Sequence, residues 1–216
     1  MLTAHEARVL GCLMEKQMTT PDYYPLTLNS LVTACNQKSS RVPVMSLSPG
    51  QVGGVVNSLR GRGLVTARMD GRADKFEQHL SRKLALSTKE RAIICVLMLR
   101  RALTLNEIRI NTGRMVSFDE TDELQGMIQG LMERDVPIVV KLPRASGQRE
   151  ERFTHLLCGK PNIETAVNGT GYSNGGDRTA AGSEQSNRIA RLEREIDGLK
   201  KDVTRLLEFA GLKQGE

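Results

Sequence analysis

The chain has 216 residues, of which 39% are hydrophobic and 26% charged. This composition is typical of a folded, water-soluble protein and excludes a chain that is disordered along its whole length. Only 3% of the residues are aromatic and Trp is absent, which argues against an aromatic stacking surface for single-stranded nucleic acid. The net charge of +6 is compatible with a polyanionic partner but is well below that of a strongly basic nucleic-acid-binding arm.

No stretch of the sequence has the length and apolar character of a membrane span. The longest apolar run, 92–99, has eight residues, against roughly 20 needed to cross a bilayer. The N-terminal 15 residues carry scattered charges and lack the pattern of a secretory signal. The four cysteines are widely separated, so we expect free thiols rather than a disulfide framework or a zinc site. We therefore expect a cytoplasmic protein that does not associate with a membrane.

The N-terminal three quarters of the chain contain an internal repeat. Each copy opens with a helix-capping box, which starts at Thr3 in the first copy and at Ser87 in the second, followed by an apolar helical stripe. Short second helices are predicted from residues 27–31 and 104–108, which are 77 positions apart. Each copy therefore begins with two helices.

A third helix is predicted in both copies. In the first copy it starts at Ser48-Pro49-Gly50-Gln51, which combines a capping residue, Pro at the first helical position and Gln three residues after the cap. Its apolar face consists of Val52, Val55, Val56 and Leu59. The corresponding face in the second copy consists of Met127, Ile128, Leu131 and Met132.

Short strands follow each third helix. The pattern predicts one hairpin from strands at 64–69 and 75–80, and another from strands at 138–142 and 152–157. Three helices closed by a two-stranded hairpin form the winged-helix arrangement.

We therefore predict an α+β fold, mainly α, with two tandem winged-helix domains. The first domain is expected at residues 1–84 and the second at 85–159. These ranges are called the first and second copy below.

Three segments of the first copy carry a longer signature. They read EKQMTTPDYYPL at 15–26, ACNQK at 34–38 and RVPVM at 41–45. This signature closely resembles the YceH-like proteins, an uncharacterised bacterial family, and the resemblance covers residues 1–159. It implies a tandem winged-helix fold, for which DNA binding is usually discussed. It implies no substrate, cofactor or catalytic residue.

The last part of the chain has a different composition. Residues 160–183 are rich in Gly, Asn, Ser and Thr, which is typical of a flexible tether. Its glycines follow no strand and precede no helix that could hold a phosphate, which argues against a nucleotide-binding loop.

Residues 184–213 show a heptad pattern with mostly β-branched residues at a and Leu at d, which favours a parallel two-stranded coiled coil and hence a homodimer. The predicted dimerisation residues are Ile189, Leu192, Ile196, Leu199, Val203 and Leu206. The alternative is an amphipathic helix that packs back on the domains.

Candidate catalytic and metal-binding residues are sparse. His5, His79 and His155 are isolated from one another in sequence, so we expect no metal site, no cofactor and no enzymatic activity. The acidic cluster at 119–123 has a structural explanation, because negative charge at the start of a helix interacts favourably with the helix dipole.

DNA is the partner that the charge distribution favours. A winged helix that reads DNA usually inserts its third helix into the major groove, where the acidic cluster of the second copy would be repelled by phosphates. Residues 1–84, by contrast, carry a net charge of +5. The predicted DNA-binding residues are Ser48, Gln51 and Asn57 in the groove and Arg41, Arg60, Arg62, Arg68, Arg72 and Lys75 on the backbone and along the hairpin.

These observations predict a dimeric regulatory protein that binds duplex DNA through its first copy, while the second copy and the C-terminal helix support assembly. The alternative is a scaffold for protein–protein interaction that binds no DNA, since Gly50, Gly53 and Gly54 leave the third helix poor in side chains that read bases.

Overall fold

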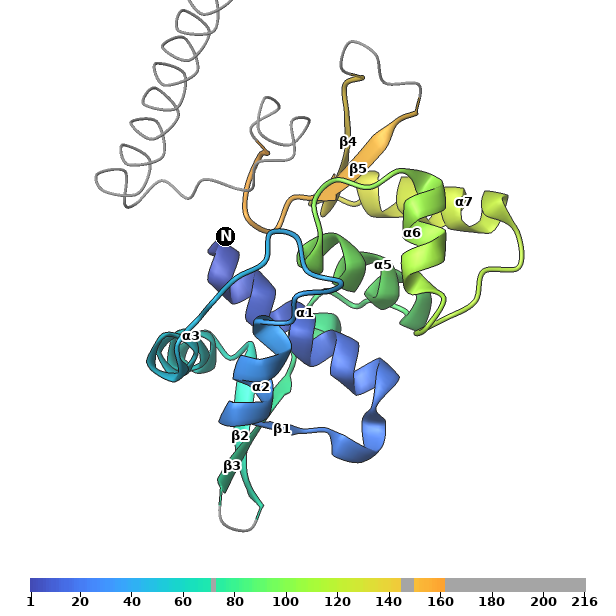
Figure 1. Cartoon of the computed structure of the whole chain (residues 1–216). Helices are drawn as coiled ribbons and strands as arrows, with labels where there is room; N and C mark the ends of the chain where they lie inside the picture. Colours follow the sequence, from blue (N-terminus) through green and yellow to red (C-terminus); the bar gives the residue numbers. More distant parts are fainter. Residues whose placement is uncertain (71–72, 145–149, 162–216) are drawn as a thin grey trace, which may run out of the picture. The chain divides into compact units, whose positions relative to one another are not determined.

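The computed structural model describes residues 1–70, 73–144 and 150–161 (Figure 1). The described part is mainly helical and includes two small antiparallel sheets. The first copy contains α1 (Ala4–Thr19), a 3₁₀ turn (Pro21–Tyr23), β1 (Leu26–Thr27), α2 (Leu28–Cys35), α3 (Pro49–Gly61), β2 (Val65–Asp70) and β3 (Ala73–Gln78). The short α4 (Leu80–Lys83) leads into the second copy, which contains α5 (Thr88–Leu99), α6 (Leu105–Thr112), α7 (Thr121–Met132), β4 (Val139–Leu142) and β5 (Arg152–His155).

The predicted helix starts are confirmed. At Thr3, Ser48 and Ser87 the capping side chain and the residue three positions later exchange hydrogen bonds with each other's backbone N–H, as a capping box requires. The hairpins also form close to their predicted positions. The sequence-based prediction missed the two-residue β1 and extended the second strand of the first hairpin to Leu80, where α4 begins.

The repeat is visible in the pairing of the strands. In the first sheet, of order β1-β3-β2, Leu26 of β1 pairs with Phe76 of β3. In the second copy Leu103 forms an isolated bridge with Phe153 of β5. Both members of the second pair lie 77 positions after their counterparts, so a short extended segment before the second helix joins the hairpin in each copy.

The third helices of the two copies are separated by fewer residues than the strands are. The buried residues of α3 are Val52, Val56 and Leu59, and those of α7 are Leu124, Ile128 and Leu131, each 72 positions later. The loop before α7 is therefore shorter than the loop before α3. Met127 and Met132, which were expected on the core face of α7, are only partly buried against the core.

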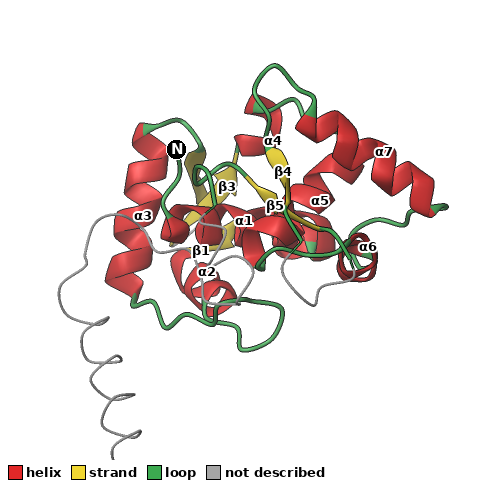
Figure 2. Cartoon of the chain, turned by 90° about the horizontal axis from the view of Figure 1, so that it is seen from above, coloured by secondary structure: helices red, strands yellow, loops and turns green. Residues whose placement is uncertain are grey.

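The core runs without a break from one copy to the other. All residues from Glu6 to Met14 of α1 and from Ala92 to Leu99 of α5 are buried, and the two helices pack directly against each other. Figure 2 shows α1 and α5 between α3 and α7. Gly11 makes the close approach possible, because a Cβ atom there would lie 2.9 Å from Cδ2 of Leu99. The described residues thus belong to one compact unit.

The remaining predictions on the fold concern the end of the chain. Apart from its first two residues, the predicted tether at 160–183 lies outside the described residues, and so does the whole of the predicted coiled-coil helix at 184–213. None of the helices in the described part combines the length and the apolar character needed to span a bilayer. The thiols of Cys12, Cys35 and Cys95 are free and buried, and that of Cys158 is free and partly exposed.

Candidate nucleic-acid interface

The N-terminal end of α3 presents Ser48 and Gln51 on the surface. Ser48 Oγ accepts a hydrogen bond from the backbone N–H of Gln51 at 3.2 Å, and Gln51 Oε1 accepts one from the backbone N–H of Ser48 at 2.9 Å. The side-chain NH₂ group of Gln51 has no hydrogen-bond partner within the described part of the chain. This NH₂ group can therefore donate to another molecule, as can the hydroxyl of Ser48, which acts as an acceptor in the capping box.

The outer face of α3 carries no acidic side chain. Asn57 and Arg60 are exposed, and their side chains form no hydrogen bond or ion pair with other described residues. A Cβ atom added at Gly54 or Gly61 would meet nothing within 4 Å. The face is thus open to close approach by another molecule, and the side chains that project from it are neutral or basic.

Arg41 does not belong to this face. Its side chain is 0% exposed, and its Nη2 lies 2.5 Å from Glu15 Oε2 on α1. Its Nε donates to the carbonyl oxygen of Ala34 at 3.0 Å. The prediction that Arg41 contacts a DNA phosphate is therefore corrected, because the side chain fixes the loop between α2 and α3 to α1 and cannot reach the surface.

Arg62 is largely occupied by contacts within the fold. It follows α3, and its Nη1 donates to Glu6 Oε2 at 2.8 Å while its Nη2 donates to the carbonyl oxygen of Met1 at 3.0 Å. Burial raises the pKa of the Glu6 carboxyl, but hydrogen bonds from Thr3, Ser58 and Arg62 outweigh this effect and hold it below its ordinary value. Arg62 thus ties the end of α3 to the start of α1.

The hairpin adds basic residues beside α3. Arg68 of β2 and Lys75 of β3 pair directly across the ladder, so their side chains start from the same face of the hairpin. Arg68 is 66% exposed and donates to Glu77 Oε1 at 3.0 Å. Arg72, the remaining predicted residue, lies outside the described residues.

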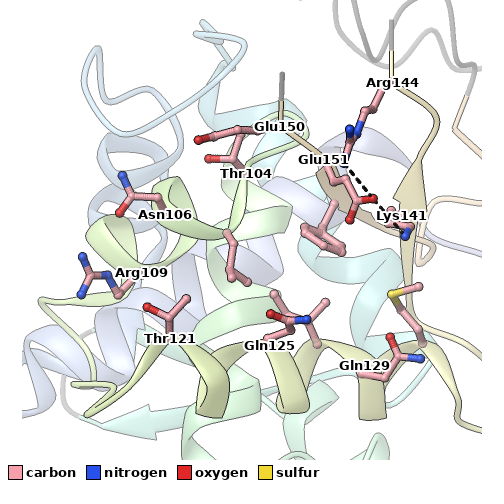
Figure 3. Close-up of a pocket in the computed structure, with 14 residues that line it drawn as sticks. Thr104, Asn106, Arg109, Thr121, Gln125, Gln129, Lys141, Arg144, Glu150 and Glu151 are labelled. Atoms are coloured by element: carbon pink, nitrogen blue, oxygen red, sulfur yellow. Dashed lines mark hydrogen bonds and ion pairs between the residues drawn. The ribbon is translucent and has the colours of Figure 1, made fainter. Parts of the chain in front are cut away.

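The second copy has a groove in the equivalent region. A cavity of about 510 Å³ lies between α6, α7 and the β4–β5 hairpin (Figure 3). Thr121, Gln125 and Gln129 line it from α7, and Arg109 lines it from α6. These residues were not predicted from the sequence, although the spacing of Gln125 and Gln129 along one helix face was a signal for them.

The charges of this groove are largely compensated within the protein. Glu151 Oε1 lies 3.2 Å from Nζ of Lys141 and 3.4 Å from Nη2 of Arg144, as the dashed lines in Figure 3 mark. Glu150 is exposed at the same rim. The groove therefore offers a phosphate less net positive charge than its three basic residues, Arg109, Lys141 and Arg144, suggest.

The acidic cluster at 119–123 lies at the start of α7, as predicted. Glu123 forms an ion pair with Lys89 of α5 and accepts a hydrogen bond from the backbone N–H of Asp119 at 3.3 Å. Asp119, Glu120 and Asp122 are exposed. This negative charge lies at the end of α7 that would have to enter a DNA groove first.

The histidines occupy different environments. His79 Nε2 hydrogen-bonds with Thr66 Oγ1 at 2.9 Å, and His5 is exposed on α1. Burial lowers the pKa of His155 to about 4, so this imidazole is neutral at pH 7. Among the described residues, no three His, Cys, Asp or Glu side chains are grouped so that they could hold a metal ion.

Comparison with known proteins assigns the chain to a family. A family model described as "Protein of unknown function, DUF480" matches residues 2–148. The chain is 44% identical to a UPF0502 protein of Cellvibrio japonicus over 209 residues, which cover 96% of this chain and 95% of that protein. It is 41% identical to a UPF0502 protein of Vibrio atlanticus over 212 residues, covering 95% and 94%, and 44% identical to one of Pseudomonas putida over 188 residues, covering 87% and 86%. In agreement with its resemblance to an uncharacterised bacterial family, the chain therefore belongs to the DUF480 family, together with these UPF0502 proteins.

Proposed function

We propose that this chain is a tandem winged-helix protein that binds duplex DNA through its first copy and acts as a regulator. The order of three helices and a hairpin in each copy supports the fold, but such folds serve several functions. The observation that carries the DNA-binding proposal is the outer face of α3, which lacks acidic side chains and presents the free side chains of Asn57 and Arg60.

Each residue of the interface has a chemical role in this proposal. The N-terminal end of α3 enters the major groove with Ser48 and Gln51, and Asn57 reads an adenine edge through its amide. Arg60, Arg68 and Lys75 bind phosphates, as does Arg72 by its place in the hairpin sequence. The glycines allow the helix backbone to approach the groove closely.

The first copy is favoured over the second by charge. The α6–α7 groove has its two hairpin cations paired with Glu151, and the start of α7 carries exposed carboxylates. Phosphates would be repelled there, so the second copy has an assembly role in the proposal.

A pair of glycine substitutions tests which copy binds. Gly54 of α3 and Gly126 of α7 occupy equivalent positions, and a Cβ atom at either would meet nothing within 4 Å. Gly54→Glu places a negative charge on the proposed interface and should weaken duplex binding by at least about tenfold, whereas Gly126→Glu, with the same net charge, should bind like the wild type. The measurement is fluorescence anisotropy of a labelled duplex with the full-length protein.

The salt dependence of the same titration gives a second criterion. Wild-type affinity should fall steeply as salt rises, and Arg60→Ala should reduce the slope of log K against log salt by about one. Binding that is undetectable or independent of salt would reject the DNA proposal. A loss confined to Gly126→Glu would move the interface to the second copy.

Dimerisation through residues 184–213 is part of the proposal. Two linked first copies would bind one duplex more tightly than either alone because the second contact becomes intramolecular. Sedimentation should give a dimer for the full chain and a monomer for a chain ending at Lys160. Monomers in both cases would reject the coiled-coil dimer.

A protein-interaction scaffold is the second candidate. The observation in its favour is the exposure of apolar side chains on the described surface, including Met69 at 91%, Val136 at 76% and Ile110 at 65%. Met69 lies in the first hairpin, on the same β-strand as Arg68. Salt-independent capture of a protein partner, lost in Met69→Ser, would support this candidate over DNA binding.

A further inference from the structure

A small cavity lies beside the contact between the two copies. It has a volume of about 40 Å³ and is lined by Arg8 of α1, by Arg100 at the end of α5, by His155 of β5 and by residues of the loop that leads to α3. A single ordered water needs about 10–15 Å³, so the cavity has room for more than one water but not for a nucleotide or a metabolite of similar size.

Arg8 is buried and has no carboxylate partner among the described residues. The residue is 2% exposed, and its guanidinium donates to the carbonyl oxygens of Cys35 at 3.0 Å and Pro43 at 2.6 Å. Its Nε is buried and has no hydrogen-bond partner in the part of the chain that the structure describes. Burial lowers the pKa of Arg8, because removing a charge from water without a counter-ion is unfavourable.

Two further guanidinium groups add to this positive charge. Arg41 is paired with Glu15, but the Arg100 side chain forms no ion pair or hydrogen bond with any described residue. Burial and the charge of Arg41 both lower the pKa of Arg100. Of these three arginines, Arg41 alone has an ion-pair partner among the described residues, and the other two, Arg8 and Arg100, line the cavity.

We infer that this cavity binds a small monovalent inorganic anion of the size of chloride. Such an ion would compensate the charges of Arg8 and Arg100 and accept the unpaired hydrogen bond of Arg8. The first turn of α1, which contributes Ala4 and Ala7 to the lining, adds the positive end of a helix dipole. The anion would also connect the second copy, through Arg100, to the loop before α3.

The inference is independent of DNA binding and can be tested without DNA. Thermal unfolding of the full-length protein is followed while chloride replaces gluconate at constant ionic strength and pH 7. The wild type should unfold at a temperature that rises with chloride by at least about 2 °C and then saturates, since a ligand that binds the folded state stabilises it by mass action.

Two neighbouring arginines provide the variant and its control. Arg100→Gln removes a cavity guanidinium, whereas Arg101→Gln removes the same charge from an exposed side chain that does not line the cavity. Arg101→Gln should keep the chloride-dependent shift and Arg100→Gln should lose it. In gluconate, Arg100→Gln should unfold at the same temperature as the wild type or higher, because it removes a partly buried charge that the charge of Arg41 disfavours. This readout separates loss of the ion from damage to the fold.

Bromide locates the ion directly. Crystals of the wild type grown in bromide should show an anomalous peak between Arg8 and Arg100, and crystals of Arg100→Gln should not. A wild-type melting temperature that does not respond to chloride, an Arg100→Gln variant that responds like the wild type, or water alone in the cavity would overturn the inference.

Discussion

Two buried arginines hold the loop that leads into α3. Arg8 binds the carbonyl oxygens of Cys35 and Pro43, and Arg41 binds the Glu15 carboxylate and the carbonyl oxygen of Ala34. Buried charges of this kind are tolerated when most of their hydrogen-bonding capacity is used. The position of the Ser48 cap, and with it the start of the proposed interface, thus depends on side chains that never reach the surface.

The buried His155 should make stability depend on pH. Its pKa is lowered to about 4 by burial, against 6.5 in an unfolded chain, so the unfolded state binds a proton more readily between these values. Stability should be fully present above pH 6.5 and fall by about 3 kcal/mol as the pH is lowered to 4.

Urea unfolding at several pH values checks this contribution. Carboxylates such as Glu6, whose pKa is lowered in the fold, lose their contribution mainly below their ordinary value of 4.5, so the interval from pH 6.5 to 5 reports chiefly on histidine. His155→Gln should flatten the pH dependence there, whereas His5→Gln, at an exposed position, should leave it unchanged. Equal slopes in the two variants would contradict the assignment.

At the scale of elements, the helical glycines have different roles. Gly11 lies in α1 where α5 packs against it, and an added Cβ would come within 3.0 Å of Leu99 and 3.3 Å of the Cβ of Met98. Gly54 lies in α3, where the same atom would meet open space. The first glycine is required by packing, while the second lowers helix stability without a packing reason in the described fold.

Alanine substitutions should therefore act in opposite directions. Gly54→Ala should stabilise the protein by about 0.5–1 kcal/mol, because alanine is the better helix former. Gly11→Ala gains the same propensity but crowds a buried helix contact, so a net loss of about 1–2 kcal/mol is expected. Chemical denaturation of both variants measures the difference, and a stabilised Gly11→Ala would show that α1 and α5 tolerate a wider separation.

At the scale of the whole molecule, the two copies share one core. The buried stretches of α1 and α5 pack against each other, and the backbone N–H of Leu2 donates to the carbonyl oxygen of Leu157 at 2.8 Å. The loop before α3 is also tied to α5, because the N–H of Val42 donates to the carbonyl oxygen of Leu99 at 2.9 Å. Either copy alone would expose an apolar helix surface.

The copies should consequently unfold together. Native-state hydrogen exchange in increasing denaturant should give the same opening free energy for the central amides of α1 and α5. A chain restricted to residues 1–84 should be unfolded or aggregated, because it exposes the α1 surface that α5 covers. Opening of α5 at a much lower free energy than α1 would instead indicate two independently stable domains.

Much of the local structure could be predicted from the sequence. Capping boxes at Thr3, Ser48 and Ser87, helical periodicity and the change to short strands are local patterns, and the structure contains the corresponding helices and hairpins. The repeat reinforced each prediction because the same order of elements occurs twice. The short β1 was missed because a two-residue strand has no periodicity and forms only through its pairing with β3.

The candidate site was less predictable, because it depends on partners that are far apart in the chain. By itself, the sequence determined the order of helices and hairpins and the basic character of the first copy. Tertiary structure alone decided which basic residues are available: Arg41 pairs with Glu15, 26 positions away, and Arg62 with Glu6, 56 positions away, so neither is a free surface charge. It likewise decided that the two copies share a core and that Arg8 and Arg100 line one cavity. Local patterns specify backbone conformation, but the environment of a charge is set by whichever side chains the fold brings next to it.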